Sequence, residues 1–107
     1  MVKEDAMPVY MMLTTLTDTG RKALQDDPEI LRGFNKEVEF MGVKMLDQYA
    51  LLGQYDFVNI VEAPSNEVVA KLATRLSAQG HFSTLTLAAI TLDSLIETLK
   101  EKDRPWQ

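Results

Sequence analysis

The chain contains no cysteine among its 107 residues. This absence excludes disulfide bonds, thiolate metal sites and cysteine nucleophiles, and it is compatible with a reducing compartment. Long apolar runs are also missing. The segment from Met1 to Met7 lacks the apolar core of a signal peptide, and no later segment approaches the roughly 18 apolar residues of a membrane span. We therefore expect a cytoplasmic protein that does not enter a membrane.

Positive charge is scarce. Eleven Lys and Arg residues stand against 16 Asp and Glu, which gives a net charge of -5 and a pI near 4.7. Such a chain repels phosphate backbones, and no cluster of basic and aromatic residues relieves the repulsion. Nucleic acid is therefore not an expected partner.

The composition, 46% hydrophobic and 25% charged, is typical of one globular domain. We expect a flexible N-terminal lead over residues 1–6, a single domain over 7–100 and a polar tail over 101–107 that includes Trp106. A chain this short buries only about 60 to 70% of the surface that its unfolded form exposes. Burial through self-association would add stability, so a homo-oligomer, either a dimer or a larger assembly, is expected.

Periodicity predicts four strands, over residues 9–16, 43–52, 57–63 and 82–90. A first helix is expected to start at Asp26–Pro28 and to end at Gly42, because Leu31, Phe34 and Val38 recur at helical spacing. Ser65 or Asn66 caps a second helix that ends at Gly80, and a short last helix begins at Thr91 or Asp93.

This order of elements predicts a ferredoxin-like α+β sandwich, βαββαβ, with the first and third strands in the centre of a four-stranded antiparallel sheet. Two helices cover one face of such a sheet. The central strands are apolar at consecutive positions, as in Tyr10–Leu13 and Phe57–Val58, which a solvated face would not be. The uncovered face is therefore expected to be buried by the sheet of another subunit.

Several short motifs follow one another along most of the chain: Met7-Pro8-Val9-Tyr10, Thr17 and Gly20, Gly53-x-Tyr55-Asp56-Phe57-Val58, and Glu62-Ala63-Pro64. In order and spacing they resemble the GYD-domain family, from about Met7 to Thr91. The resemblance implies a ferredoxin-like fold similar to the dimeric α/β-barrel proteins, in which two sheets pack face to face. It carries no established catalytic residue.

The motif residues Gly53, Tyr55 and Asp56 allow two interpretations. Gly53 supplies a positive φ, Asp56 hydrogen-bonds turn amides and Tyr55 packs on a neighbour, so that all three fix a hairpin. Alternatively, the carboxylate beside the phenol binds a polar ligand or acts as a general base. The structural interpretation is favoured.

A ligand-binding surface is predicted from strand parity. If Val58, Ile60, Leu85 and Leu87 face the helices, the other face is apolar with a few hydroxyls and one amide, which suits a small molecule. With Tyr49 added, the residues of this hypothesis are Tyr10, Met12, Thr14, Tyr49, Phe57, Asn59, Thr84 and Thr86. The alternative is that the threonines serve strand propensity and Asn59 is paired across an interface.

His81 is the only side chain that, unperturbed, exchanges protons near neutral pH, and it is the candidate acid or base. We expect it at the opposite end of the sheet from Asp56, some 20 Å away, so that the two would meet only across an interface. A metal site made by His81 with Glu62 is the remotest alternative. Methionines are expected to fill the core, and no metal or cofactor is expected.

The leading functional hypothesis is a binding or assembly module, with a small-ligand pocket between the sheets. The alternative is a cofactor-independent enzyme, of oxygenase or isomerase type, acting on a small hydrophobic substrate inside the barrel. A closed pocket of about 300 Å³ or more that the sheet face encloses, with a titratable group on its wall, would favour the enzyme, whereas a face packed solid between subunits would favour assembly.

Overall fold

A computed structural model describes residues 7–101. The elements follow in the order β1 (Val9–Leu16), α1 (Asp18–Asp26), α2 (Ile30–Phe40), β2 (Lys44–Ala50), β3 (Phe57–Glu62), α3 (Asn66–Ala78), β4 (Phe82–Ala89) and α4 (Leu92–Lys100). The expected lead over 1–6 and most of the expected tail, with Trp106, lie outside the described residues.

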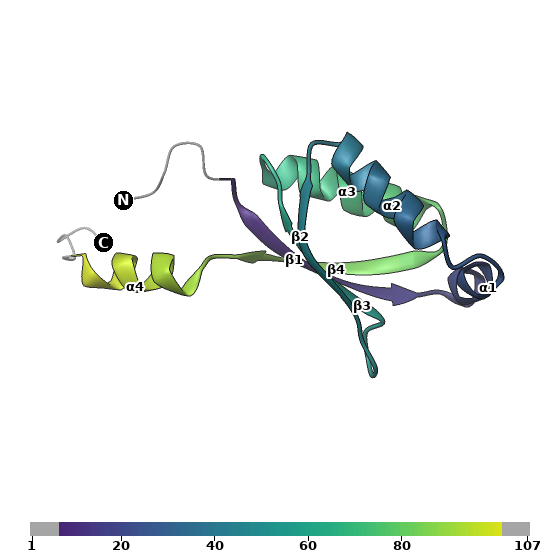
Figure 1. The fold of residues 1–107 in the computed structure, drawn as a ribbon. Coiled ribbons are helices and arrows are strands. Elements are labelled where there is room, and N and C mark those ends of the chain that lie inside the picture. The colour runs from purple at the N-terminus through teal and green to yellow at the C-terminus, as the bar shows by residue number, and fades with distance from the viewer. Residues whose placement is uncertain (1–6, 102–107) are drawn as a thin grey trace.

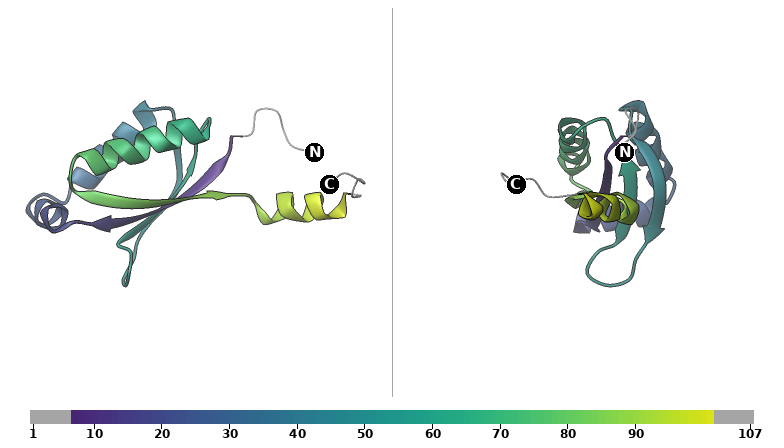
Figure 2. Two further views of the ribbon diagram at one scale, coloured as in Figure 1. Left: turned by 180° about the vertical axis from the view of Figure 1, so that it is seen from behind. Right: turned by 90° about the vertical axis from the view of Figure 1, so that its left-hand side faces the viewer.

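The four strands form one sheet in the order β2-β3-β1-β4, and every neighbouring pair is antiparallel. The predicted ferredoxin-like α+β fold is confirmed, with β1 and β3 in the centre. Helices α2 and α3 lie side by side on one face of the sheet, and no described helix covers the other face (Figures 1 and 2). We call this second surface the open face.

Helix α1 was not predicted. Thr17 caps it, since its Oγ1 accepts a hydrogen bond from the backbone N–H of Gly20 at 2.9 Å. The helix carries only two apolar side chains, Ala23 and Leu24, both partly buried. That pattern is too sparse for periodicity to reveal a helix.

Helix α2 begins two residues later than expected, because Pro28 lies in a turn in which Asp27 Oδ1 accepts from the Glu29 N–H at 3.1 Å. Gly42 ends the segment with a φ of 79°. Strand β2 is shorter than predicted and carries a bulge at Leu46, where its register with β3 shifts. Ser65 and Thr91 cap α3 and α4 as expected, through their side-chain oxygens.

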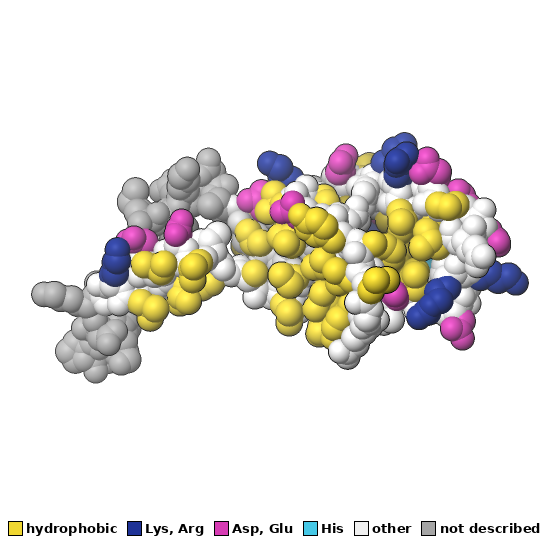
Figure 3. Space-filling model, turned by 60° about the horizontal axis from the view of Figure 1, so that its bottom comes forward, with side chains coloured by type: hydrophobic (Ala, Val, Ile, Leu, Met, Phe, Trp, Pro, Cys, Tyr) yellow, Lys and Arg dark blue, Asp and Glu magenta, His cyan; other side chains and the backbone are white. Residues whose placement is uncertain are grey.

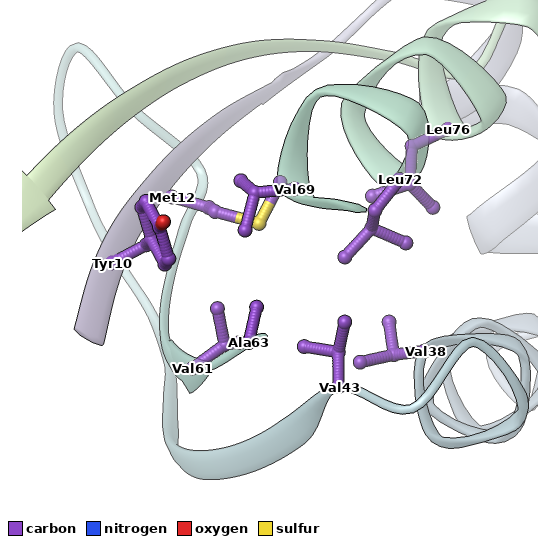
Figure 4. Close-up of a cluster of buried hydrophobic side chains, with 9 residues drawn as sticks. All are labelled: Tyr10, Met12, Val38, Val43, Val61, Ala63, Val69, Leu72 and Leu76. Carbon is purple, nitrogen blue, oxygen red and sulfur yellow. The ribbon is translucent and has the colours of Figure 1, made fainter. Parts of the chain in front are cut away.

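The core lies between the sheet and α2 with α3 (Figure 4). Its buried members come from β1, α2, α3, the end of β3 and the residue before β2: Tyr10, Met12, Val38, Val43, Val61, Ala63, Val69, Leu72 and Leu76. The core therefore uses one face of the sheet only.

Helix α4 extends away from the sheet beyond the end of β4, which gives the molecule extents of 57 × 29 × 21 Å (Figures 1 and 2). None of its residues is buried, and it makes no substantial packing contact with another described element. Within residues 7–101, no helix has the length and apolar character needed to cross a membrane.

Candidate functional site

The residues predicted to line a ligand site do not share the open face. Tyr10, Met12, Thr14 and Asn59 are buried beneath the helices. Cross-strand partners share a face, and the partners of Met12 are Asn59 on β3 and Thr86 on β4. By the same pairing Phe57 and Thr84, both opposite Thr14, belong to the helix side. The predicted parity was therefore wrong.

Tyr49 is the exception among the predicted residues. It pairs with Val58 on the open face, and 58% of its surface is exposed. It is the one predicted ligand-lining residue that a second molecule approaching the open face would meet.

Tyr10 is held in the core rather than turned toward a ligand. Its hydroxyl donates a hydrogen bond to Asn66 Oδ1 at the start of α3, and its ring lies beside Val61 and Val69 (Figure 4). A buried phenol needs such a partner, so the contact ties β1 to α3.

Three of the predicted residues, Thr14, Phe57 and Asn59, line a small cavity between the sheet and α2. Its other walls come from the helix layer, β2 and β4: Leu31, Phe34, Asn35, Val38, Met45, Gln48, Leu76 and Phe82. The cavity has a volume of about 40 Å³. That volume suits ordered water but is far below the roughly 300 Å³ of a typical small-molecule site.

An amide chain runs from the surface to the edge of this cavity. Gln48 Nε2 donates to Asn59 Oδ1 at 2.8 Å, and Asn35 Nδ2 donates to Gln48 Oε1 at 2.8 Å. The side-chain oxygen of Asn59 thus has a hydrogen-bond donor within its own subunit. It does not need the alternative, a partner across an interface.

The motif residues build the β2–β3 hairpin. Gly53 has a φ of 123°, which favours glycine. Asp56 Oδ2 accepts a hydrogen bond from the backbone N–H of Leu16 at 2.7 Å, and the backbone N–H of Asp56 donates to the Thr14 carbonyl at 2.9 Å. Asp56 therefore fastens the hairpin to the end of β1, as the structural interpretation requires.

His81 and Asp56 lie at the same end of the sheet, so the expected separation along the strands was wrong. Strands β3 and β4 are both antiparallel to β1 and therefore start together. The Thr17 N–H donates to the His81 carbonyl, one residue beyond the Leu16 amide that Asp56 binds. The two side chains nevertheless flank β1, about two strand spacings or 10 Å apart, so they form no dyad.

The His81 ring lies edge-on to Phe34, with ring centroids 6.5 Å apart, and its Nδ1 is buried without a hydrogen-bond partner. Glu62 pairs with Val9 at the opposite end of β1, seven residues from Leu16. The suggested metal pair of His81 and Glu62 is therefore contradicted. No group of three or more potential His, Asp or Glu ligands comes together anywhere in the described part of the chain.

The parity prediction assigned the wrong strand residues to the open face. The large apolar residues of this face are partly or substantially exposed: Met11, Leu13, Val58, Ile60, Leu85 and Leu87; by cross-strand pairing Asp47 and Ser83 also lie on this face. Leu85 and Leu87 each expose 44% of their surface. Apolar side chains gather on the side of the molecule seen in Figure 3, over the sheet and along α4.

The hairpin tip adds to this apolar surface. Leu51 is 36% exposed and Leu52 is fully exposed, and the hairpin projects from the sheet on the side away from α2 and α3 (Figure 1). Sequence reasoning placed the turn correctly but did not single out these two leucines, although two adjacent leucines before a turn glycine are an available signal.

Comparison with known proteins gives three findings. The family model described as the GYD domain matches residues 10–99. A protein of Thermus thermophilus, named glutamine synthetase and cystathionine beta-lyase binding protein, is 44% identical over 95 residues, which are 88% of this chain and all of that protein. The crystal structure of MtbAldR resembles the fold with a TM-score of 0.60 at 19% identity, over 85% of this chain and 60% of that one.

The structural similarity at 19% identity supports the fold alone. The family match reaches Leu99, eight residues further than the resemblance read from the sequence, so it includes most of α4. With 90 of 107 residues matched (10–99), the chain belongs to the GYD-domain family.

Proposed function

We propose that the chain is a homo-oligomeric protein-binding module of the cytoplasm. Two copies cover each other's open face, and the outer surface formed by the helices then remains free to hold a different protein. The module acts by assembly and needs no catalytic group.

The observation that carries this proposal is the open face. Burying apolar area is worth about 25 cal/mol per Å². A wet sheet face of several hundred Å² would forfeit on the order of ten kcal/mol, which is comparable with the whole stability of a domain. A second sheet of the same shape and character is the simplest cover, because aligned sheets pack well face to face.

Binding or conversion of a small molecule has less support. The cavity beneath α2 holds about 40 Å³, and its polar wall groups are neutral amides and a hydroxyl. A ligand between two sheets would meet mostly apolar side chains, together with the polar groups of Asp47, Tyr49 and Ser83, which strand pairing places on the same face. We therefore do not favour the enzyme of oxygenase or isomerase type.

The name of the Thermus thermophilus relative suggests the kind of partner. At 44% identity over the whole of that relative, we propose that this chain also binds an enzyme of nitrogen or sulfur amino-acid metabolism, with glutamine synthetase and cystathionine beta-lyase as first candidates. Phe40 marks a suitable contact. It is 86% exposed at the end of α2, whereas the other exposed large hydrophobic residues of the described chain lie on the strands, the hairpin and the segment from Ile90 to Leu99.

The test has two measurements. Native mass spectrometry of the purified chain is expected to show an oligomer without a retained small molecule. Surface plasmon resonance with glutamine synthetase and cystathionine beta-lyase from the same source is expected to show saturable binding to at least one of them. A monomer that binds neither enzyme contradicts the proposal, and an oligomer with a stoichiometric bound metabolite favours the ligand-binding alternative.

A further inference from the structure

Helix α4 turns its polar side toward its own subunit. A groove of about 680 Å³ separates the helix from the start of β1, and the α4 side chains that line it include Asp93, Ser94, Glu97 and Thr98. None of the four large apolar residues of α4 lines this groove. The apolar side of α4 therefore does not pack against its own domain.

The apolar side is a regular stripe. Leu92, Leu95, Ile96 and Leu99 follow the i, i+3, i+4, i+7 pattern, and they expose 71%, 40%, 39% and 72% of their surface. A helix of nine residues is marginal in water, because isolated helices shorter than about 12 to 15 residues do not persist. The stripe therefore needs a cover if α4 is to remain folded.

The stripe continues the open face. Leu85 and Leu87 lie on the open face of β4, and Ile90, which is 68% exposed, joins that strand to the cap of α4. Figure 3 shows apolar side chains of the sheet and of α4 on the same side of the molecule. A molecule that covers the open face is thus placed to cover the stripe as well.

We propose that α4 is an interchain arm, whose stripe of Leu92, Leu95, Ile96 and Leu99 packs on a second copy of this chain. The inference rests on the proposed homo-oligomer and adds the element that completes its interface. The arm also belongs to the family's domain rather than to an appended tail, since the GYD-domain match runs to Leu99.

The area needed by a stable dimer supports a second copy. Four strands about 4.8 Å apart and about seven residues long present roughly 440 Å² of sheet, about half of the roughly 800 Å² that each partner buries in a specific complex. An arm of nine residues, about 13 Å long and 10 Å wide, adds roughly 130 Å². Each copy gains this area twice, once by giving its arm and once by receiving the partner's, which brings the interface close to the usual size.

Charge argues against a membrane as the cover. Helices that lie on anionic lipid surfaces carry Lys and Arg on their polar side. The polar side of α4 has Asp93 and Glu97 with Lys100, and Glu101 follows. An arm with this acidic character is better suited to a protein surface.

The first experiment is sedimentation equilibrium of the full chain and two matched double variants. Leu95→Asp with Leu99→Asp places two charges on the stripe, and Ser94→Asp with Thr98→Asp places the same charges, at the same spacing, on the groove side. We expect the stripe variant to raise the dissociation constant of the oligomer roughly tenfold or more and the control to change it less than about threefold. Equal effects of the two variants would overturn the arm.

The second experiment does not require a variant that weakens the oligomer. Because the chain has no cysteine, Leu95→Cys and Thr98→Cys each carry one unique site for a benzophenone photocrosslinker. We expect the Leu95 probe to give covalent dimers and the Thr98 probe to give far fewer. Crosslinks confined to one chain overturn the inference even if the protein is an oligomer, which leaves the proposed function standing.

Two further outcomes would show that the stripe is covered by something other than a second copy of the chain. If the stripe variant self-associates like the unmodified chain but no longer binds the partner enzyme, α4 contacts that enzyme and the arm is wrong. If the chain sediments with vesicles of phosphatidylcholine and phosphatidylglycerol and the stripe variant does not, the cover is a lipid surface. A chain that is monomeric at all concentrations contradicts the arm and the proposed oligomer together.

Discussion

Gly20 of α1 lies directly against the backbone carbonyl of His81: a Cβ atom at position 20 would stand 2.1 Å from that oxygen. The same junction is fixed by two hydrogen bonds of Thr17, from its N–H to the His81 carbonyl at 2.9 Å and from its hydroxyl to the Gly80 carbonyl at 2.6 Å. The start of α1 is thereby docked on the start of β4, which explains why a threonine and a glycine follow β1 at this spacing.

Substitution Gly20→Ala is expected to lower the free energy of unfolding by about 3 kcal/mol, because backbone atoms must move to admit the methyl group. Gly33→Ala is the matched control. It lies in α2, and no atom beyond its chain neighbours and the helix's own backbone comes within 4 Å of the added Cβ, so it should raise the free energy of unfolding by about 0.5–1 kcal/mol. Urea unfolding followed by circular dichroism measures both, and two similar values would contradict the close approach at Gly20.

The carboxylate of Asp56 is expected to stabilise the hairpin through its hydrogen bond with the Leu16 amide. Asp56→Ala should cost about 1.5–3 kcal/mol of unfolding free energy, and Asp56→Asn less, since an amide oxygen still accepts. Asp26→Ala, an exposed carboxylate at the end of α1, should change stability by no more than about 0.5 kcal/mol. If Asp56→Ala behaves like this control under the same denaturant titration, Asp56 is free for another role.

The amide chain offers a graded test of burial. Asn59→Ala removes the buried acceptor of Gln48 Nε2 and should cost about 1–3 kcal/mol, whereas Asn35→Ala, nearer the solvent, should cost less than about 1 kcal/mol. Thermal unfolding of the two variants gives the comparison. Equal losses of stability would mean that the contribution of each amide does not depend on how deeply it is buried.

Much of the fold followed from the sequence because its signals were local. Pro64 ended β3 as expected, Ser65 and Thr91 capped helices, and Gly42, Gly53 and Gly80 took positive φ. The order of strands then followed from handedness and short connections. Helix α1 was missed although its Thr17 cap is a local signal, because Ala23 and Leu24 alone give no helical periodicity and the contacts that dock its start on residues 80–81 lie outside any window of neighbouring residues.

The candidate site could not be assigned because both faces of the sheet are apolar. Tyr10, Met11, Met12 and Leu13 fit either parity, and β4 misleads: its leucines lie on the open face and its threonines, Thr84 and Thr86, on the helix side. Placing Val58, Ile60, Leu85 and Leu87 beneath the helices therefore reversed the two faces of the sheet. The conclusion that the uncovered side is apolar did not depend on that choice, since either parity leaves large hydrophobic residues there.

Phe40 separates binding of another protein from self-association. Phe40→Ser should weaken binding of the partner enzyme roughly tenfold, because exposed aromatic residues often anchor interfaces, and it should leave the oligomer intact. Glu39→Ser, also exposed on α2, is the control and should have little effect. Surface plasmon resonance and sedimentation of the same samples decide, and unchanged binding by Phe40→Ser would move the partner site elsewhere.

A charge on the open face should separate the subunits without unfolding them. Leu87→Asp places a carboxylate where the side chain is already 44% exposed in one copy, so the fold tolerates it. Burial of that charge between two sheets should raise the dissociation constant by about a hundredfold or more. Ala70→Asp, on the exposed side of α3, is the control and should leave assembly unchanged. Light scattering coupled to size exclusion would report a folded monomer for the first variant.

The most direct measurement is sedimentation equilibrium of the unmodified chain over a dilution series from high to low micromolar concentration. The account predicts a mass at least twice the 12.1 kDa of one copy at the upper end, with dissociation only on dilution. A mass of one copy throughout, with native circular dichroism, would mean that the open face is stable in water and would contradict the account.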